Sequence, residues 1–226
     1  MNNLFFRAIR ATLFGFVCFF AVIFIPAWTL NYWQGWAFFL TLGILTSLAT
    51  IYIAIHDKKL LERRMNVGPT AEKTLVQKII TAIGLPLFMA AILIMVFDHR
   101  FGWSPTVPAF ISVFGDALAA LGILIYYFVV KENCYAGATI EVERGQTVVS
   151  TGLYAIVRHP MYAGAILVFI GMPLALASWW GLLFVPVFIG GFAWRLLHEE
   201  TFLGQHLEGY MEYKYKVRYR LVPYVW

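Results

Sequence analysis

The sequence predicts an all-α membrane protein, a polytopic bundle of about six transmembrane helices. Of its 226 residues, 61% are hydrophobic and only 13% are charged, and the mean hydropathy is +0.75. Apolar runs of about 18 residues or more recur along the chain, which is the length that crosses a bilayer core. These runs lack the two-residue alternation of a membrane β-barrel, so helices are expected.

The first expected span covers about residues 11–30 and follows Arg7 and Arg10. A positive start before an apolar run resembles a signal peptide. However, the run continues for about 20 residues and ends in Ile25-Pro26-Ala27-Trp28, without a small-x-small cleavage site. We therefore expect an uncleaved membrane helix.

Five further spans follow, and aromatic residues mark where they turn. The spans are expected at about 34–55, 79–97, 109–130, 161–177 and 181–197. Tryptophans and tyrosines gather at membrane interfaces, and they flank the first and last turns here: Trp28, Tyr32, Trp33, Trp36, Trp179 and Trp180. Asp116 lies about seven residues into the fourth span, and we expect it at the outer interface.

The distribution of basic residues orients the chain. With these spans, 16 of the 17 Lys and Arg residues fall on one side, and only Arg100 falls on the other. The positive-inside rule then places both termini in the cytoplasm, and we expect a bacterial inner membrane. Basic cytoplasmic loops also explain the formal net charge of +5, so we expect no nucleic-acid partner.

Two loops on the basic side carry features of their own. Residues 56–78 predict a short helix and a turn at Gly68-Pro69, and they serve either as a solvated anchor or, through Arg63 and Arg64, to recruit anionic lipid or an acidic partner. Residues 131–160 predict an ordered connection. In it, 146–151 is extended and Gly152 starts a helix that Pro160 interrupts.

If the last two spans form a hairpin, two polar clusters return to one membrane surface. Arg158-His159-Pro160 precedes the hairpin, and Arg195 to Glu200 ends it. Taken singly, Arg195 and Glu199 read as a surface i,i+4 pair worth a few tenths of a kcal/mol, and Pro160 as the first turn of a helix. Together, acid and guanidinium groups suit a zwitterionic ligand such as S-adenosylmethionine, whose sulfonium favours carboxylates and aromatics.

The combined pattern resembles a known family. Gly152-x-Tyr154-x-x-x-Arg158-His159-Pro160-x-Tyr162-x-Gly164 is followed by Arg195-x-x-x-Glu199-Glu200-x-x-Leu203 and Tyr210-x-x-Tyr213. This pattern resembles the isoprenylcysteine carboxyl methyltransferase family and, more loosely, the membrane phospholipid methyltransferases. The resemblance extends from Asn133 to Pro223, so we divide the chain into a four-helix region, 1–130, and a catalytic region, 131–226.

The resemblance implies an integral-membrane methyltransferase that uses S-adenosylmethionine and faces the cytoplasm. The implied acceptor is lipophilic, foremost a carboxylate of isoprenylcysteine type. Catalytic roles are implied for Arg158, Glu199 and Glu200. Cofactor contacts are implied for Tyr154, His159, Pro160, Tyr162, Arg195, Glu199, Tyr210 and Tyr213. No metal is expected, because the two cysteines have no ligand spacing.

Several alternatives remain open from the residues alone. A phospholipid amine would need a proton removed, which His159 or a glutamate would have to accept. A nicotinamide-dependent membrane reductase of sterol-reductase type shares a similar C-terminal region. Arg158 would orient a carboxylate of either the cofactor or the acceptor. The tyrosine-rich and basic C-terminal segment predicts an interfacial helix on membrane lipid that also closes over the cofactor.

Overall fold

The protein is a bundle of long helices joined by short turns at one end and longer segments at the other. The computed structural model describes residues 2–226, with side chains from residue 4 onward. Its helices are α1 (Asn2–Ala27), α2 (Trp33–His56), α3 (Lys58–Met65), α4 (Leu75–Phe101), α5 (Ala109–Glu132), η1 (Gly152–Ala155), α6 (Pro160–Ala175), η2 (Trp180–Phe184), α7 (Val185–His206) and α8 (Tyr210–Lys216). Residues 2–226 contain no β-strand.

Five helices are long and apolar enough to cross a membrane. They are Leu4–Ala27, Trp33–His56, Leu75–Phe101, Ala109–Glu132 and the continuous run Trp180–His206. In a bilayer a helix satisfies all its backbone hydrogen bonds internally, which favours this form for apolar runs. The all-α bundle is therefore confirmed. The fifth expected span is the 16-residue helix α6, which is shorter than the other five.

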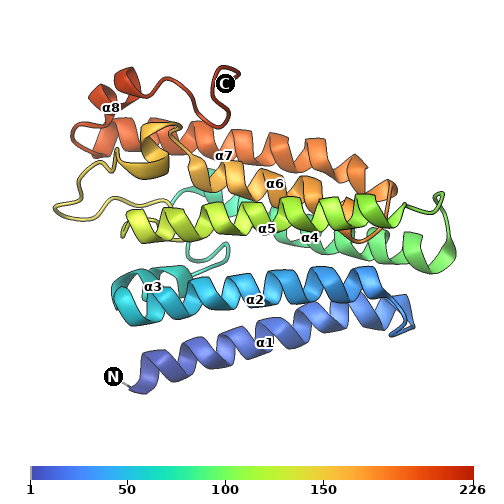
Figure 1. The fold of residues 1–226 in the computed structure, drawn as a ribbon. Coiled ribbons are helices and arrows are strands. Elements are labelled where there is room, and N and C mark those ends of the chain that lie inside the picture. The colour runs from blue at the N-terminus through green and yellow to red at the C-terminus, as the bar shows by residue number, and fades with distance from the viewer. Residues whose placement is uncertain (1) are drawn as a thin grey trace.

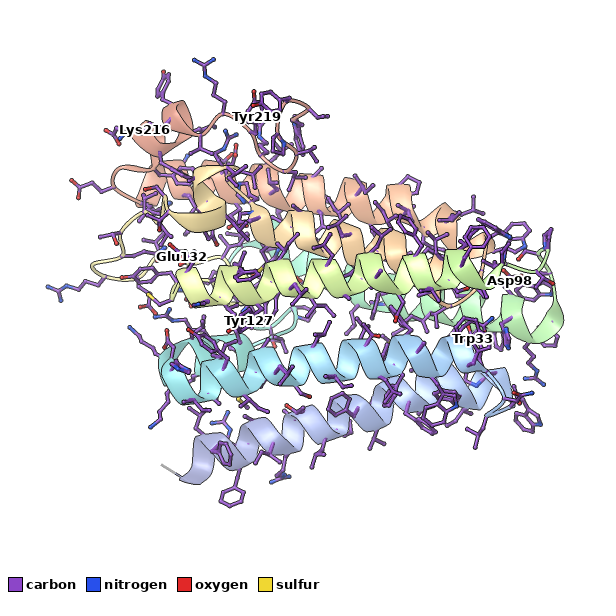
Figure 2. All side chains as sticks on the ribbon, viewed as in Figure 1. Trp33, Asp98, Tyr127, Glu132, Lys216 and Tyr219 are labelled. Atoms are coloured by element: carbon purple, nitrogen blue, oxygen red, sulfur yellow. The ribbon has the colours of Figure 1, made fainter. Side chains whose placement is uncertain are left out.

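The two ends of the bundle differ in character. Figure 1 shows the α1–α2 turn, the α4–α5 loop and the α6–η2 connection at one end, and the N-terminus, α3, the 132–159 connection and α8 at the other. We call the second end the motif end, because Arg158 and Glu200 both belong to it. In Figure 2, Glu132 and Lys216 lie at the motif end, whereas Trp33 and Asp98 lie at the far end.

Helices α5 and α6 pack closely because glycines face each other. A Cβ atom on Gly122 would collide with the carbonyl oxygen of Gly164, and one on Gly171 would collide with that of Gly115. Small residues let helix backbones approach in a membrane, where van der Waals packing drives association. This contact sets the position of α6, which begins directly after the Arg158-His159 pair.

A buried polar cluster holds the far end together. The carboxylate of Asp98 in α4 accepts hydrogen bonds from Ser178 Oγ (2.6 Å) and from the backbone and hydroxyl of Ser104 (2.7 Å each). Tyr32 donates its hydroxyl to the carbonyl of Leu176 at 2.6 Å. These contacts connect the start of α2 and the end of α4 to the α6–η2 turn, and so align α6 with α7.

The connecting segments follow the expectations in part. The short helix in 56–78 is α3, which Asp57 caps by accepting from Leu60 N–H, and Gly68 turns the chain at φ +105°. Residues 146–151 form no strand, although Thr151 has the expected extended backbone, and Gly152 starts one short turn, η1. The prediction that Pro160 interrupts a helix is wrong, and the alternative, that it lies in the first turn of a helix, is confirmed. Pro160 begins α6, where its missing N–H costs no helical hydrogen bond.

Asp116 of α5 has a hydrogen-bond partner on a neighbouring helix. It lies about two turns into α5, and Thr41 of α2 donates a hydrogen bond of 2.6 Å to its Oδ2. A polar pair between membrane helices contributes modestly to their association. Asp116 therefore joins α2 to α5, and it lies away from the polar clusters of the motif end.

Candidate active site

One large cavity opens at the motif end and continues between the membrane helices. Its volume is about 790 Å³. We call its outer part the charged pocket. It is lined by Arg64, Glu72, Asn133, Tyr154, Arg158, His159, Pro160, Tyr162, Arg195, Glu199, Tyr210, Tyr213 and residues 135–141 and 146–149. We call its inner part the apolar cleft; it is lined by α4 (Ile80 to Phe88), α6 (Ala165, Phe169) and α7 (Val187 to Trp194).

Glu200 is the centre of a buried ionic cluster beside the pocket. Its side chain is only 3% exposed. Its Oε1 accepts from Arg158 Nε at 2.7 Å and lies 3.3 Å from His159 Nε2. Its Oε2 lies 3.2 Å from Arg220 Nε and 3.4 Å from Lys214 Nζ. Glu200 does not line the cavity, so its contacts position Arg158 and His159.

The C-terminal segment 217–220 holds the same pair through its backbone. Arg158 N–H donates to Tyr219 O and His159 N–H donates to Arg220 O, both at 2.9 Å. Arg158 Nη1 also donates to the carbonyls of Val217 (2.8 Å) and Arg218 (2.7 Å). Within residues 2–226, Nη2 of Arg158 has no acceptor. Because Arg158 lines the cavity, this nitrogen is the part of the guanidinium left for a ligand.

A second chain of polar contacts crosses the pocket from α6 to α7. Tyr162 donates its hydroxyl to Glu199 Oε2 at 2.6 Å, and Arg195 Nε donates to the Tyr162 oxygen at 3.2 Å. Arg195 then donates to Gln77 Oε1 (2.7 Å), Glu72 Oε1 (2.8 Å) and the carbonyl of Ala138 (3.1 Å). Arg195 thus spans from α7 to the α3–α4 loop, and it does not form the surface pair with Glu199.

Tyr154 and Tyr210 supply neutral hydroxyls to the pocket, and Tyr213 supports Tyr154. Asn133 donates to the Tyr154 hydroxyl at 2.9 Å, and Tyr213 donates to the Tyr154 carbonyl at 2.8 Å. The Tyr210 hydroxyl is buried and has no partner in the described part of the chain. Burial raises the pKa of Tyr154 to about 12, and burial together with the Glu200 charge raises the pKa of Tyr210. Both remain protonated near neutral pH and can donate.

The structure brings together the residues singled out in the sequence. Of these, only Glu200 lies outside the cavity wall, because adjacent residues on a helix project about 100° apart. The sequence prediction missed Glu72 and Gln77, and it assigned Arg64 to a possible lipid or partner contact and not to this cavity, which Arg64 lines. The only sequence signal for Glu72 was an acidic residue within a strongly basic loop, which also fits an ordinary solvated residue. Arg64 packs over the Tyr126 ring and donates to Met161 Sδ.

The pocket combines groups that suit a ligand carrying both charges. Arg158 Nη2 can bind a carboxylate, Glu199 can bind an ammonium, and the tyrosine rings suit a sulfonium. The unpartnered hydroxyl of Tyr210 is a further sign of fit, since buried polar groups normally have a partner.

A comparison with known families points to the same region of the chain. Residues 110–208 match the family model described as phospholipid methyltransferase. This range runs from α5 to the end of α7 and includes Arg158, His159, Tyr162, Arg195, Glu199 and Glu200. No curated protein matches the chain. The match, together with the five apolar helices, indicates an integral-membrane methyltransferase.

Proposed function

We propose that this protein transfers a methyl group from S-adenosylmethionine to the head group of a lipophilic acceptor. One observation carries the proposal: a single cavity joins a charged pocket to an apolar cleft between membrane helices. Ligand sites are usually apolar cavities with a few placed polar groups, and this one has space for a polar cofactor beside a lipid chain. The match of residues 110–208 supports the reaction class.

Different residues of the charged pocket would each bind a different part of the cofactor. When bound, S-adenosylmethionine supplies a methyl group on a sulfonium, whose carbon–sulfur bond breaks as the acceptor's bond to that carbon forms. Arg158 would orient the cofactor carboxylate, and Glu199 would bind its ammonium. His159, Tyr154 and Tyr210 would contact the remainder. Glu200 would act indirectly by fixing Arg158 and His159.

The protein would accelerate the reaction chiefly by positioning and by excluding water. Holding two reactants in line removes much of the entropic barrier. Loop residues 135–141 and 146–149 line the charged pocket and helices line the apolar cleft, while segment 217–220 holds Arg158 and His159 by backbone hydrogen bonds. We expect the C-terminal segment to close over the cofactor when it is bound. A water-poor site also favours the meeting of an anionic nucleophile with a sulfonium, because opposite charges cancel there.

Two acceptor head groups fit this reaction. The first is a carboxylate of isoprenylcysteine type, which the sequence motif suggests and which needs no base. The second is a phospholipid amine, which the family match favours. An amine must lose a proton before it attacks, and His159 or Glu199 would accept it.

We further propose that the motif end faces the cytoplasm of a bacterial cell. Of the 17 Lys and Arg residues, only Arg100 lies on a segment at the far end, at the end of α4. This asymmetry is the pattern of the positive-inside rule.

Cofactor binding can be tested by calorimetry on the detergent-purified protein with S-adenosylhomocysteine. We expect binding that Glu199→Gln abolishes and that Tyr210→Phe weakens about fivefold, the value of one hydrogen bond of about 1 kcal/mol. Tyr213→Phe is the matched control, since that hydroxyl already donates within the protein. Binding of a reduced nicotinamide dinucleotide in place of S-adenosylhomocysteine would instead establish a reductase.

The product identifies the acceptor class. Methyl transfer from the radiolabelled cofactor into a lipid extract yields a base-labile ester from a carboxylate and a base-stable product from an amine. Absence of any labelled lipid, with S-adenosylhomocysteine still bound, would contradict a lipophilic acceptor.

A further inference from the structure

Arg64 of α3 lines the charged pocket without an oxygen acceptor for its guanidinium. Its Nη2 donates to the sulfur of Met161 at 3.0 Å, and a thioether is a weak acceptor. The guanidinium also lies over the ring of Tyr126, 4.8 Å from the centroid. Within residues 4–226, Nε is enclosed without a partner, whereas Nη1 has no partner and is not enclosed. Nη1 is therefore the nitrogen that Arg64 can present to a ligand.

The ion pairs around the cavity leave Arg64 without a counter-ion. Arg158 Nε lies 2.7 Å from Glu200 Oε1, and Arg195 Nη2 lies 2.8 Å from Glu72 Oε1. Among the residues that the structure describes, no carboxylate pairs with Arg64 in this way. A half-buried cation without a counter-ion is poorly compensated, so it attracts an anionic group of a ligand.

The acids around the cavity leave Glu199 in the complementary state. Of the three that line it, one is paired with Arg195, and Glu141 is paired with Lys73 at 2.8 Å. Glu199 accepts from the neutral hydroxyl of Tyr162, and no cation of the described residues forms an ion pair with it. The cavity wall therefore presents one unpaired cation and one unpaired anion.

The two unpaired charges act on the same hydroxyl group, that of Tyr154. Burial raises the pKa of this hydroxyl; the charge of Glu199 raises it further, and the charge of Arg64 lowers it. Electrostatic interactions weaken with distance, so both charges lie near this part of the pocket. An α-amino acid carries a carboxylate and an ammonium on one carbon atom, and the amino-acid end of S-adenosylmethionine has this arrangement.

Resting on the proposed function, we propose that Arg64 binds the carboxylate of the cofactor while Glu199 binds its ammonium. A guanidinium and a carboxylate form strong, charge-assisted hydrogen bonds. Arg158, whose charge Glu200 already neutralises, retains one N–H donor, Nη2, for the same carboxylate. Arg64 lies outside the range 110–208 that matches the family model, so α3 of the N-terminal half contributes directly to cofactor binding.

The test compares S-adenosylhomocysteine with its decarboxylated analogue, which keeps the ammonium and lacks the carboxylate. Affinities are measured by calorimetry on the full chain in detergent. Arg64→Met retains an apolar stem against Tyr126 and Met161 and removes the charge. It should weaken binding of S-adenosylhomocysteine about tenfold or more, and change the affinity for the decarboxylated analogue by less than about twofold.

Two further variants serve as controls. Lys59→Met removes an exposed positive charge from the same helix, where it is paired with Glu143, and should change neither affinity. Arg64→Lys keeps the charge at the pocket and should recover part of the lost affinity, because lysine binds a carboxylate as a point charge. Thermal unfolding in detergent verifies that each variant is folded.

Three results would overturn this inference. A folded Arg64→Met protein might bind S-adenosylhomocysteine as tightly as wild type, or lose affinity for both ligands equally. In the second case Arg64 would shape the pocket and not bind the carboxylate. Weaker binding of N-acetyl farnesylcysteine with unchanged S-adenosylhomocysteine affinity would assign Arg64 to a carboxylate of the acceptor instead.

The outcome for the wild-type protein separates this inference from the function on which it rests. If wild type binds no S-adenosylhomocysteine, the proposed methyl transfer itself fails. If wild type binds it and Arg64→Met binds it equally well, the proposed function stands and only the role of Arg64 is wrong.

Discussion

At the scale of single residues, two adjacent glutamates have opposite roles. Glu199 lines the cavity and accepts from Tyr162, whereas Glu200 is buried among Arg158, His159, Lys214 and Arg220. Both side chains are acids on the same helix, and the turn of about 100° between them decides which faces a ligand. A motif of two glutamates thus contains one binding group and one structural group.

This division predicts different consequences for the same substitution. Glu200→Gln should destabilise the protein by about 3–5 kcal/mol, since it leaves Arg158 buried without its counter-ion. Glu199→Gln should change stability by less than about 1 kcal/mol, because the amide oxygen can still accept from Tyr162. Denaturant unfolding of both variants in detergent measures the difference. Equal stabilities would contradict a structural role for Glu200.

At the scale of elements, the packing of α5 against α6 positions the site, and α4 and α7 line the apolar cleft that leads into it. Glycines 115, 122, 164 and 171 bring α5 and α6 into backbone contact. By contrast, Gly84 of α4 and Gly190 and Gly191 of α7 line the cleft with no atom near the position of a Cβ. Glycines therefore have two roles here. Those between α5 and α6 allow close helix packing, and those on α4 and α7 leave free volume in the cleft.

A matched pair of leucine substitutions distinguishes these two uses. Gly122→Leu must push α6 away from α5 and should cost about 1–3 kcal/mol or more. Gly84→Leu enters open space, and it should hold or raise stability, because glycine is about 1 kcal/mol less favourable in a helix. The Gly84 variant should nevertheless slow methyl transfer to long-chain acceptors. Thermal unfolding and transfer assays on both variants check this, and normal transfer by Gly84→Leu would exclude the cleft as the lipid site.

At the scale of the whole molecule, orientation can be tested with its own cysteines. Cys134 is exposed at the motif end, and Cys18 lies within α1. In a Cys18→Ser background, a membrane-impermeant maleimide should label Cys134 in inside-out vesicles and leave it unlabelled in right-side-out vesicles. The reverse pattern would place the motif end outside the cell.

The overall architecture could be predicted from sequence because it depends on local properties. Apolar runs specify the helices, and basic loops specify which helix ends lie on the same side of the membrane. That Arg158 and Glu200 lie close together therefore followed from the topology alone. The role of Pro160 stayed open in the sequence, since a proline can either begin or interrupt a helix, and the structure shows that it begins α6. The direction in which each side chain points could be determined only from the tertiary structure.

The site was predictable only where its residues form a motif. Tyr162 and Glu199 were identified because their spacing is recognisable. Glu72 could not be, since its burial depends on Arg195, which is 123 residues away in the chain. Segment 217–220 binds Arg158 through backbone carbonyl groups, and such contacts cannot be read from the pattern of side chains.

The short length of α6 has a consequence for the surrounding bilayer. Its 16 residues extend for about 24 Å, whereas a hydrocarbon core is about 30 Å thick. Every residue of α6 is buried or half-buried, so the longer helices around it meet the lipid and span the core. Pro160, where α6 begins, lines the charged pocket. We therefore expect the charged pocket to be recessed to the depth of the lipid head groups, so that an acceptor can reach it without leaving the bilayer.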